Sequence, residues 1–505
     1  MQIRLRKGSL ADQKADLIAV GVFQEGKRVA KESLSVLPKP LAEEIRLFLE
    51  REKFEPSLGS SFFVRSVSGE PGHSILVVGL GKKQEEIGEE TVRQFAAVAV
   101  NVAKQTHTKK IVVAVDPSWV DGAEKACLCG KALAEGAHLA AYEFAKYKSE
   151  TKSGTVEAMD LFSENLKQAR ALEDGVKIGT WYARATAEAR DLVNEPAKHL
   201  RPSDLVKAAR KIGTASKGKI SIRVFTETQL EKMGAGGLLG VSRGSDEDAF
   251  LVHLVYKPLK AKQRIALVGK AVTFDSGGMS LKPADAMMTM KCDMSGAAAV
   301  LGAFSVLCEL RPNVEVHGIF GACENLPSGK AIVPGDVLRA LNGKTIEVLN
   351  TDAEGRLTLA DTLTYASRQK PDVLIDLATL TGACIVALGE EVAGVMSDDS
   401  NLSDRLLACA GKAGEKMWRL PLESSYAKLL KSEVADLKNI TGTSRYGGAL
   451  TAGLFLKEFV PEGLSWAHID IAGPAFAEKP LNPYTKHGGT GFGVRTLLEY
   501  LRSVK

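Results

Sequence analysis

The chain has 505 residues, of which 45% are hydrophobic and 25% charged, with a net charge of +5 from 66 basic and 61 acidic residues. This is the balance of a globular protein, and so small and scattered a basic excess gives no argument for binding nucleic acid or membranes. A chain of this length exceeds what one hydrophobic core serves, so we expect two domains. The N-terminus lacks the apolar segment of a secretion signal, and no uninterrupted apolar run reaches ~18 residues, so we expect a cytoplasmic location and no membrane contact.

Residues 1–160 are expected to form an N-terminal α/β domain with three layers and a mostly parallel sheet. Short apolar runs bounded by turn residues predict strands, and Ala-rich stretches with helical periodicity predict helices. We see no catalytic residues in this domain, so its expected role is packing and assembly. The predicted strands are Leu17–Phe23, Ser61–Ser66, Ser74–Gly81 and Lys110–Asp116, and the predicted helices are Glu90–Thr106 and Asp121–Ala145.

Residues 161–192 are interpreted as a linker and a connecting helix, Thr180–Leu192, which ends near Pro196 because the residue before proline avoids helical geometry. Residues 193–505 form the second predicted domain. Its strands alternate with helices such as Ser295–Leu310 and Leu357–Arg368, which predicts a mixed or doubly wound α/β sheet. The predicted strands are Ser221–Thr226, Leu251–Tyr256, Arg264–Phe274, Val314–Cys323, Asp372–Thr379 and Trp466–Ala472.

Two acids and an arginine alternate in the stretch N-T-D-A-E-G-R-L at residues 350–357. On an extended backbone Asp352, Glu354 and Arg356 would point to one face. A divalent metal ion would neutralise the two carboxylates and leave the arginine free to hold an anion. The alternative interpretation is a solvated turn with a local ion pair.

A second stretch, residues 269–296, places Lys270, Asp275, Lys282 and Asp293 among apolar or small residues. Together with Asp352 and Glu354, its two aspartates carry four negative charges, which two divalent ions would cancel, as in two-metal hydrolases. Lys270 would then be a neutral amine ligand, since burial and nearby cations lower the pKa of a lysine.

These candidates follow predicted strands, and in doubly wound sheets sites form beyond the carboxyl ends of the strands. Gly277 and Gly278 permit the tight bend that such a site needs. None of the eight histidines forms an H-E-x-x-H pair, and His253, His317 and His468 are predicted to be packed or hydrogen-bonded core residues. A site with oxygen ligands favours Mn²⁺ or Zn²⁺, with Mg²⁺ as a further option.

Three motifs together resemble the leucyl aminopeptidase family, the cytosol aminopeptidases with two metal ions. They are V-G-K-A-V-T-F-D-S-G-G at 268–278, K-C-D-M-S-G-A-A at 291–298 and N-T-D-A-E-G-R-L at 350–357. The resemblance runs in order through the C-terminal two-thirds of the chain. It departs at Ala271, where the family commonly has glycine. It implies a macrodomain-like N-terminal domain, a homohexamer, and hydrolysis of the first peptide bond of peptide substrates by a water molecule that bridges two metal ions.

The resemblance also implies a role for each site residue. One metal would be held by Lys270, Asp275, Asp293 and Glu354, and a more exchangeable metal by Asp275, Asp352 and Glu354. We assign Lys282 to stabilising the oxyanion. The resemblance implies that Arg356 binds bicarbonate, with backbone groups near Gly355 and Leu357 assisting it.

The pocket for the N-terminal side chain of the peptide should be apolar, with a preference for leucine, methionine and similar residues. For its lining residues, ordinary core packing is an almost equally good interpretation. The residues that the family pattern implies are Met290, Thr379, Ala472 and Ala475, with Asn350, Leu380 and Gly382 nearby.

Two other functions stay open at this point. Some bacterial relatives bind DNA, and the basic segments Lys146–Lys152 and Lys207–Lys219 give weak support for that here. A dinuclear phosphoesterase is a third alternative, because similar metal pairs cleave phosphate esters.

Overall fold

A computed structural model describes residues 1–6, 16–65, 74–83, 87–150, 154–162, 166–442 and 446–504. The chain divides into two compact units: Met1–Arg184 with Pro480–Lys486, and Ala185–Lys479 with His487–Lys505. The predicted fold class, an N-terminal α/β domain followed by a mixed α/β domain, is confirmed. Ser66, the predicted end of one strand, and residues 151–153, which include the end of the segment Lys146–Lys152, lie outside the described residues.

The sheet of the first unit is parallel except at one edge. Each neighbouring pair from β1 to β5 is parallel, whereas β4 is antiparallel to β5 and the short β3 (Arg28–Val29) is antiparallel to β2. In sheet order the strands are β1 (Gln2–Arg6), β7 (Ala158–Phe162), β6 (Lys110–Ala114), β2 (Leu17–Glu25), β5 (Ser74–Lys82) and β4 (Ser61–Val64).

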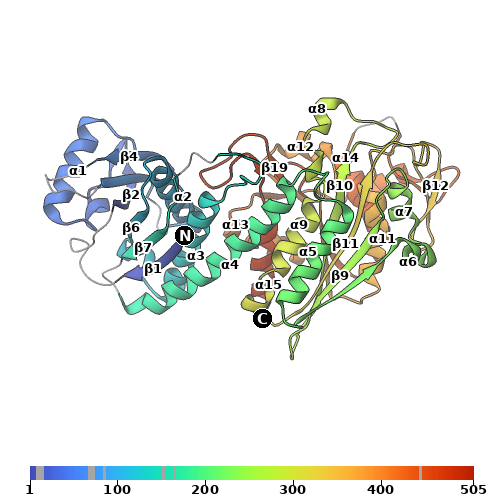
Figure 1. The fold of residues 1–505 in the computed structure, drawn as a ribbon, viewed down its shortest axis with the longest axis horizontal. Coiled ribbons are helices and arrows are strands. Elements are labelled where there is room, and N and C mark those ends of the chain that lie inside the picture. The colour runs from blue at the N-terminus through green and yellow to red at the C-terminus, as the bar shows by residue number, and fades with distance from the viewer. Residues whose placement is uncertain are drawn as a thin grey trace. The chain divides into compact units, whose positions relative to one another are not determined.

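Side chains of β2 alternate between two separate cores. Leu17 belongs to the core shared with helices α2 (Glu89–Gln105) and α3 (Ala123–Ala141), which pack against each other (Figure 1). Ile18 belongs to the opposite core, with Ile45 of α1 (Lys39–Arg51). This alternation produces three layers, as predicted.

The second unit contains a mixed eight-stranded sheet. Its central strands β18, β14, β10 and β11 are parallel, and antiparallel strands flank them on both sides. In sheet order the strands are β16 (Met417–Arg419), β15 (Ala393–Met396), β18 (Ser465–Asp470), β14 (Val373–Ala378), β10 (Arg264–Asp275), β11 (Glu315–Asn325), β9 (Phe250–Tyr256) and β8 (Ile220–Phe225).

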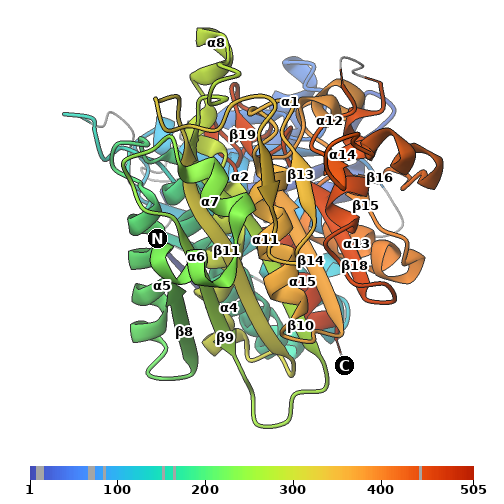
Figure 2. The same cartoon turned by 90° about the vertical axis from the view of Figure 1, so that its right-hand side faces the viewer.

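Helices cover both faces of this sheet (Figure 2). Helices α11 (Gly355–Ser367) and α7 (Gly236–Ser242) pack on one face, and α9 (Ser295–Phe304) and α5 (Pro202–Ala215) on the other. Gly269 of β10 faces α9 so closely that a Cβ there would lie 2.4 Å from the amide nitrogen of Ala297. The alternation of side chains along β10 then places Lys270 on the α11 face.

Two predicted helices differ in length from those of the structure. The connecting helix is part of a longer helix, α4 (Ala169–Asn194), and the predicted helix Ser295–Leu310 is broken into α9 and α10 (Leu307–Leu310). Among the described residues, Ala284–Leu310 is the one stretch long and apolar enough to cross a membrane. It is divided among several helical pieces, and 78% of its most apolar window is buried inside the protein. A buried core segment therefore explains its composition.

The predicted core histidines are buried and hydrogen-bonded. Between β9 and β11, the Nε2 of His253 lies 2.8 Å from the Nδ1 of His317, and the Nδ1 of His253 lies 3.0 Å from the hydroxyl of Tyr365. The chain of polar contacts ends at Glu315, 2.9 Å from the Nε2 of His317. Burial, followed by repulsion from His317 and Arg223, lowers the pKa of His253 to about 4.

We predict that acid destabilises the second unit through the pair of His253 and His317. Because the folded-state pKa of His253 is about 4, the stability that its neutral form contributes is complete above pH ~6.5 and is lost as the pH falls towards 4. The loss is on the order of 2–3 kcal/mol. Melting temperatures measured from pH 8 to pH 4.5 should fall more steeply for the wild type than for His253→Gln. Equal slopes would contradict the assignment.

Candidate metal centre

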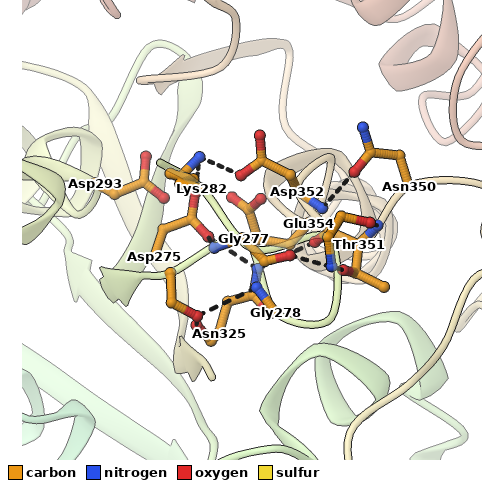
Figure 3. Close-up of polar contacts among 12 residues, drawn as sticks. Asp275, Gly277, Gly278, Lys282, Asp293, Asn325, Asn350, Thr351, Asp352 and Glu354 are labelled. Atoms are coloured by element: carbon orange, nitrogen blue, oxygen red, sulfur yellow. Dashed lines mark hydrogen bonds and ion pairs between the residues drawn. The ribbon is translucent and has the colours of Figure 1, made fainter. Parts of the chain in front are cut away.

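Strand β10 lies at the point where the sheet order diverges, with β14 on one side and β11 on the other. All three strands run parallel, so their carboxyl ends meet at one edge of the sheet. Crevices at such a point are where open α/β sheets bind ligands. Asp275 is the last residue of β10, and the polar candidates gather around it (Figure 3).

Three buried carboxylates converge at this edge. Asp275 ends β10, Asp293 follows the short 3-10 turn Met290–Cys292, and Glu354 immediately precedes α11. An oxygen from each of the three carboxylates lies within 4.8 Å of the others, and their side chains point towards one another (Figure 3). The structure therefore brings together residues that lie up to 79 positions apart in the sequence, the distance from Asp275 to Glu354.

Lys270 lies among these acids. Its Nζ is 2.7 Å from Asp293 Oδ1 and 2.7 Å from Glu354 Oε1. Burial disfavours the ammonium, but the charges of Asp293, Glu354 and Asp275 outweigh burial and raise the pKa of Lys270. Without a metal ion Lys270 is therefore a cation, and the neutral amine that we predicted requires the positive charge of a metal nearby. Helix α11 can begin beside Lys270 because its first residue, Gly355, has no side chain. A Cβ at this position would lie 2.5 Å from Lys270 Cε.

The donor set fits a divalent cation. Asp293 Oδ2 and Glu354 Oε2 are buried and have no hydrogen-bond partner among the described residues. Burial, together with the neighbouring carboxylates, raises the pKa of Asp293 even though Lys270 opposes the shift. Buried carboxylate oxygens without donors are costly, and hard divalent cations are the partners that satisfy them. Asp275, Asp293 and Glu354 therefore fit a divalent cation, and the full set of predicted metal ligands stays a prediction.

Lys282 and Asp352 lie further out at the same edge. Lys282 Nζ is 2.8 Å from Asp275 Oδ2 and also contacts Asp352, whose side chain is 35% exposed. Burial opposes the charge of Lys282, but the carboxylates of Asp275 and Glu354 raise its pKa, so it remains an ammonium. Asp352 is the most accessible of the predicted ligands, and the exchangeable metal assigned to it stays a prediction.

A two-glycine turn carries the chain from β10 to Lys282. Gly277 and Gly278 have φ angles of +85° and +61°, in the region that favours glycine. A Cβ on Gly278 would lie 2.7 Å from Asn325 Oδ1, so a side chain there would displace a residue that contacts the site. The predicted need for glycine at this bend is confirmed.

The predicted extended conformation of the D-x-E-x-R stretch is wrong. The backbone amide of Asp352 donates to Asn350 Oδ1 at 2.8 Å, which turns the chain, and Glu354 already has helical angles of −76° and −35°. Arg356 lies in the first turn of α11, where residues two apart do not share a face. The acids and the arginine are therefore presented by a turn that leads into a helix.

Arg356 is buried, and only some of the hydrogen-bond donors of its guanidinium have partners among the described residues. Its Nη1 donates to the carbonyl oxygen of Asn439 at 2.7 Å, while its Nε has no partner among the described residues. Burial lowers the pKa of Arg356 to about 10, against the opposing charges of Glu354 and Asp470, so the side chain is a cation at neutral pH. Its Nε is a donor that an anion can use, and the bicarbonate role stays a prediction.

The predicted substrate-pocket residues lie in differing environments. Thr379 donates its hydroxyl to Asp293 Oδ1 at 2.7 Å, and its carbonyl accepts from Lys270 Nζ at 3.0 Å, so it also holds the ligands in place. Leu357, which was predicted at the bicarbonate site and not in the pocket, is fully buried in the core, so only its backbone is left for binding an anion. Of the remaining residues, Ala475 is buried, Met290, Asn350, Leu380 and Ala472 are half-buried, and Gly382 is exposed.

Three supporting residues were absent from the predicted site. Asn325, at the end of β11, donates to Asp275 Oδ1 at 2.8 Å, and Asp470, at the end of β18, accepts from Thr381 Oγ1 at 2.7 Å. Asn439 donates to the carbonyl of Asn350 at 2.6 Å. Polar residues at the ends of predicted strands are a signal that could have found Asn325 and Asp470, whereas Asn439 follows a strand of only two residues and has no such signal.

Comparison with known proteins agrees with this geometry. Residues 187–498 match the catalytic domain, and residues 19–151 the N-terminal domain, of the cytosol aminopeptidase family. A probable cytosol aminopeptidase of Aquifex aeolicus is 42% identical over 506 residues, covering all of this chain and 99% of the relative. One of Alkaliphilus oremlandii is also 42% identical, over 508 residues, and covers both chains completely.

Two solved structures are also similar. A tomato leucine aminopeptidase mutant superposes with a TM-score of 0.88 at 36% identity, covering 99% of this chain and 96% of that one. The bottromycin maturation enzyme BotP in complex with Mn has a TM-score of 0.84 at 36% identity, covering 97% of this chain and 99% of that one. The chain therefore belongs to the cytosol aminopeptidase family and is a metal-dependent aminopeptidase.

Proposed function

We propose that the enzyme is a leucyl aminopeptidase that binds two divalent metal ions and removes leucine and similar apolar residues from the N-terminus of peptides. The observation that carries the proposal is the buried cluster of Asp275, Asp293 and Glu354, in which two carboxylate oxygens have no partner in the part of the chain that the structure describes. Lys270 would complete the inner set of ligands, and Asp352 the outer set. Divalent ions at these positions supply Lewis acidity towards the scissile carbonyl and lower the pKa of a water molecule towards neutrality.

The protein's own cations would act on the charge that develops during hydrolysis. Lys282 is held at the rim of the cluster by Asp275 and Asp352, and as an ammonium it can donate to the oxyanion of the substrate. The Nε of Arg356 donates to no residue that the structure describes, and we propose that Arg356 holds a bicarbonate ion whose oxygens accept and return a proton. The free amino group of a peptide would bind as the neutral amine to a metal held by the cluster, which would restrict cleavage to the first bond.

Selectivity would come from small and apolar residues at the same edge. Ala475 is buried, and Ala472, two residues after the end of β18, is half-buried. The hydroxyl of Thr379 is committed to Asp293, so its methyl group is the part left to contact a substrate. This lining supports a pocket of moderate size without charge, as a leucyl side chain requires.

Loss of a ligand should remove metal and activity together. The wild type supplied with Mn²⁺ should hydrolyse leucyl p-nitroanilide, and a chelator should abolish turnover until Mn²⁺ is restored. Asp293→Ala and Glu354→Ala should bind metal at least about tenfold more weakly, because each leaves the cluster one charge short. Metal per chain is measured by mass spectrometry, with the exposed Asp246→Ala as control. Full activity in Glu354→Ala would refute the proposal.

Loss of the two cations should instead reduce turnover at constant metal content. For Lys282→Ala we expect a fall in kcat of about 10²–10³-fold, typical of removing an oxyanion donor. For Arg356→Ala we expect a smaller fall of about 10²-fold, in the range of a proton-transfer group. The exposed Lys262→Ala is the matched control. If either variant loses its metal, the residue supports the ligands and does not act on the substrate.

Filling the proposed pocket should change specificity. Ala472→Leu adds three carbon atoms at the half-buried position, so kcat/KM for leucyl p-nitroanilide should fall about 10–200-fold. The value for alanyl p-nitroanilide should change little, and it serves as the internal control. Equal losses for both substrates would show that Ala472 does not line the side-chain pocket.

A further inference from the structure

The turn that carries Asp352 is bound by the side chain of one residue from a distant part of the chain. Asn439 comes directly after β17 (Leu437–Lys438), which pairs in parallel with β13 (Thr345–Glu347). Its backbone amide adds one more bond to this pairing by donating to the carbonyl oxygen of Glu347 at 2.9 Å. The side chain of Asn439 is fully buried and provides the hydrogen bonds that follow along the chain.

Asn439 binds the main chain on both sides of Asn350. Its Oδ1 accepts from the amide of Leu349 at 2.8 Å and from that of Asn350 at 3.4 Å. Its Nδ2 donates to the carbonyl oxygen of Asn350 at 2.6 Å and to that of Ala353 at 3.5 Å. One amide group, with an acceptor at one end and a donor at the other, therefore fixes the main chain before and after Asp352.

The two acids of this turn differ in how far they depend on Asn439. Glu354 has other supports, because its Oε1 lies 2.7 Å from Lys270 Nζ and α11 begins directly after it. Asp352 lies outside the helix, and its backbone amide donates to Asn350 Oδ1 (Figure 3). Asn350 is the residue that Asn439 binds through both its amide and its carbonyl. Loss of the Asn439 side chain should therefore displace Asp352 more than Glu354.

The main chain of Asn439 also binds Arg356. Its carbonyl oxygen accepts from Arg356 Nη1 at 2.7 Å, and both residues are buried. One residue is thus bonded through its side chain to the turn that carries Asp352, and through its main chain to the guanidinium. The second bond does not involve the side chain, so a substitution at this position removes the bonds to the turn and leaves the acceptor for Arg356.

We propose that Asn439 is a positioning residue, whose side chain sets the place of Asp352 and thereby the affinity for the outer, exchangeable metal ion. This inference rests on the proposed function, in which Asp352 is a ligand of that ion. Residues that orient a metal ligand typically contribute about 10–100-fold to metal affinity. The inner ion, held by Lys270, Asp293 and the two shared carboxylates, does not depend on Asn439.

Titration of Mn²⁺ into the full-length protein, after a chelator has removed its metal, tests the proposal by calorimetry. The wild type should bind two ions, one tightly and one more weakly. Asn439→Leu removes the side-chain hydrogen bonds at nearly constant volume, whereas Asn439→Ala removes them and also leaves a cavity. In both variants the weaker ion should bind about 10–100-fold less tightly, and the tight ion as in the wild type. Asn401→Ala, an exposed residue of α13 (Ser400–Ala413), is the control.

Turnover gives a second readout. At limiting Mn²⁺ both Asn439 variants should hydrolyse leucyl p-nitroanilide more slowly than the wild type. At saturating Mn²⁺ their kcat should return to the wild-type value, because every residue assigned to the metal ions and the substrate is still present. Asp352→Ala, which removes the ligand itself, should not be restored in this way.

Four results would overturn the role of Asn439. They are wild-type binding of both ions in both variants, loss of the tight ion as well, an effect in Asn439→Ala alone, and a kcat that stays low at saturating Mn²⁺. Loss of both ions would show that Asn439 supports the fold as a whole, and an effect in Asn439→Ala alone would assign it to the cavity. Binding of a single ion by the wild type would instead refute the proposed function, and the role of Asn439 with it.

Discussion

The interaction on which the catalytic unit depends is the meeting of three buried carboxylates with one buried lysine. The carboxylates of Asp275, Asp293 and Glu354 carry three negative charges against the single positive charge of Lys270. Two of their oxygens have no donor among the described residues. Such a cluster is unfavourable in a metal-free interior, because buried charges are tolerated only when they are paired. The fold therefore holds these side chains in an arrangement that a divalent cation would stabilise.

Close packing of the backbone makes this arrangement possible. Gly269 allows α9 to approach β10, and a Cβ on Gly296 would lie 2.0 Å from the carbonyl oxygen of Leu377 in β14. Because α9 lies against both strands, Asp293, two residues before its start, is carried to the sheet edge. On the opposite face of β10, Gly355 leaves room for the side chain of Lys270 because it has no Cβ. Small residues at these positions decide whether side chains on three different elements can reach one ion.

The two units use one principle of α/β folds for different chemistry. In each unit a parallel strand lies between two parallel neighbours, and polar groups gather where the strand order diverges. In the second unit the polar groups are buried carboxylates suited to a metal ion. In the first unit a cavity at the corresponding position has apolar walls and charges of both signs.

The sequence by itself determined the two-domain α/β class, most central strands and the identity of the acids and lysines that meet at β10. It could do so because strand and helix periodicity depends on local burial, and because metal ligands are limited to a few residue types. The tertiary structure decided the rest. Asp352, Glu354 and Arg356 are presented by a turn and a helix, because the side chain of Asn350 accepts from the backbone of Asp352 and ends the extended path. The supporting role of Asn439, and the return of Pro480–Lys486 to the first unit, depend on contacts between residues far apart in the chain, which no local pattern encodes.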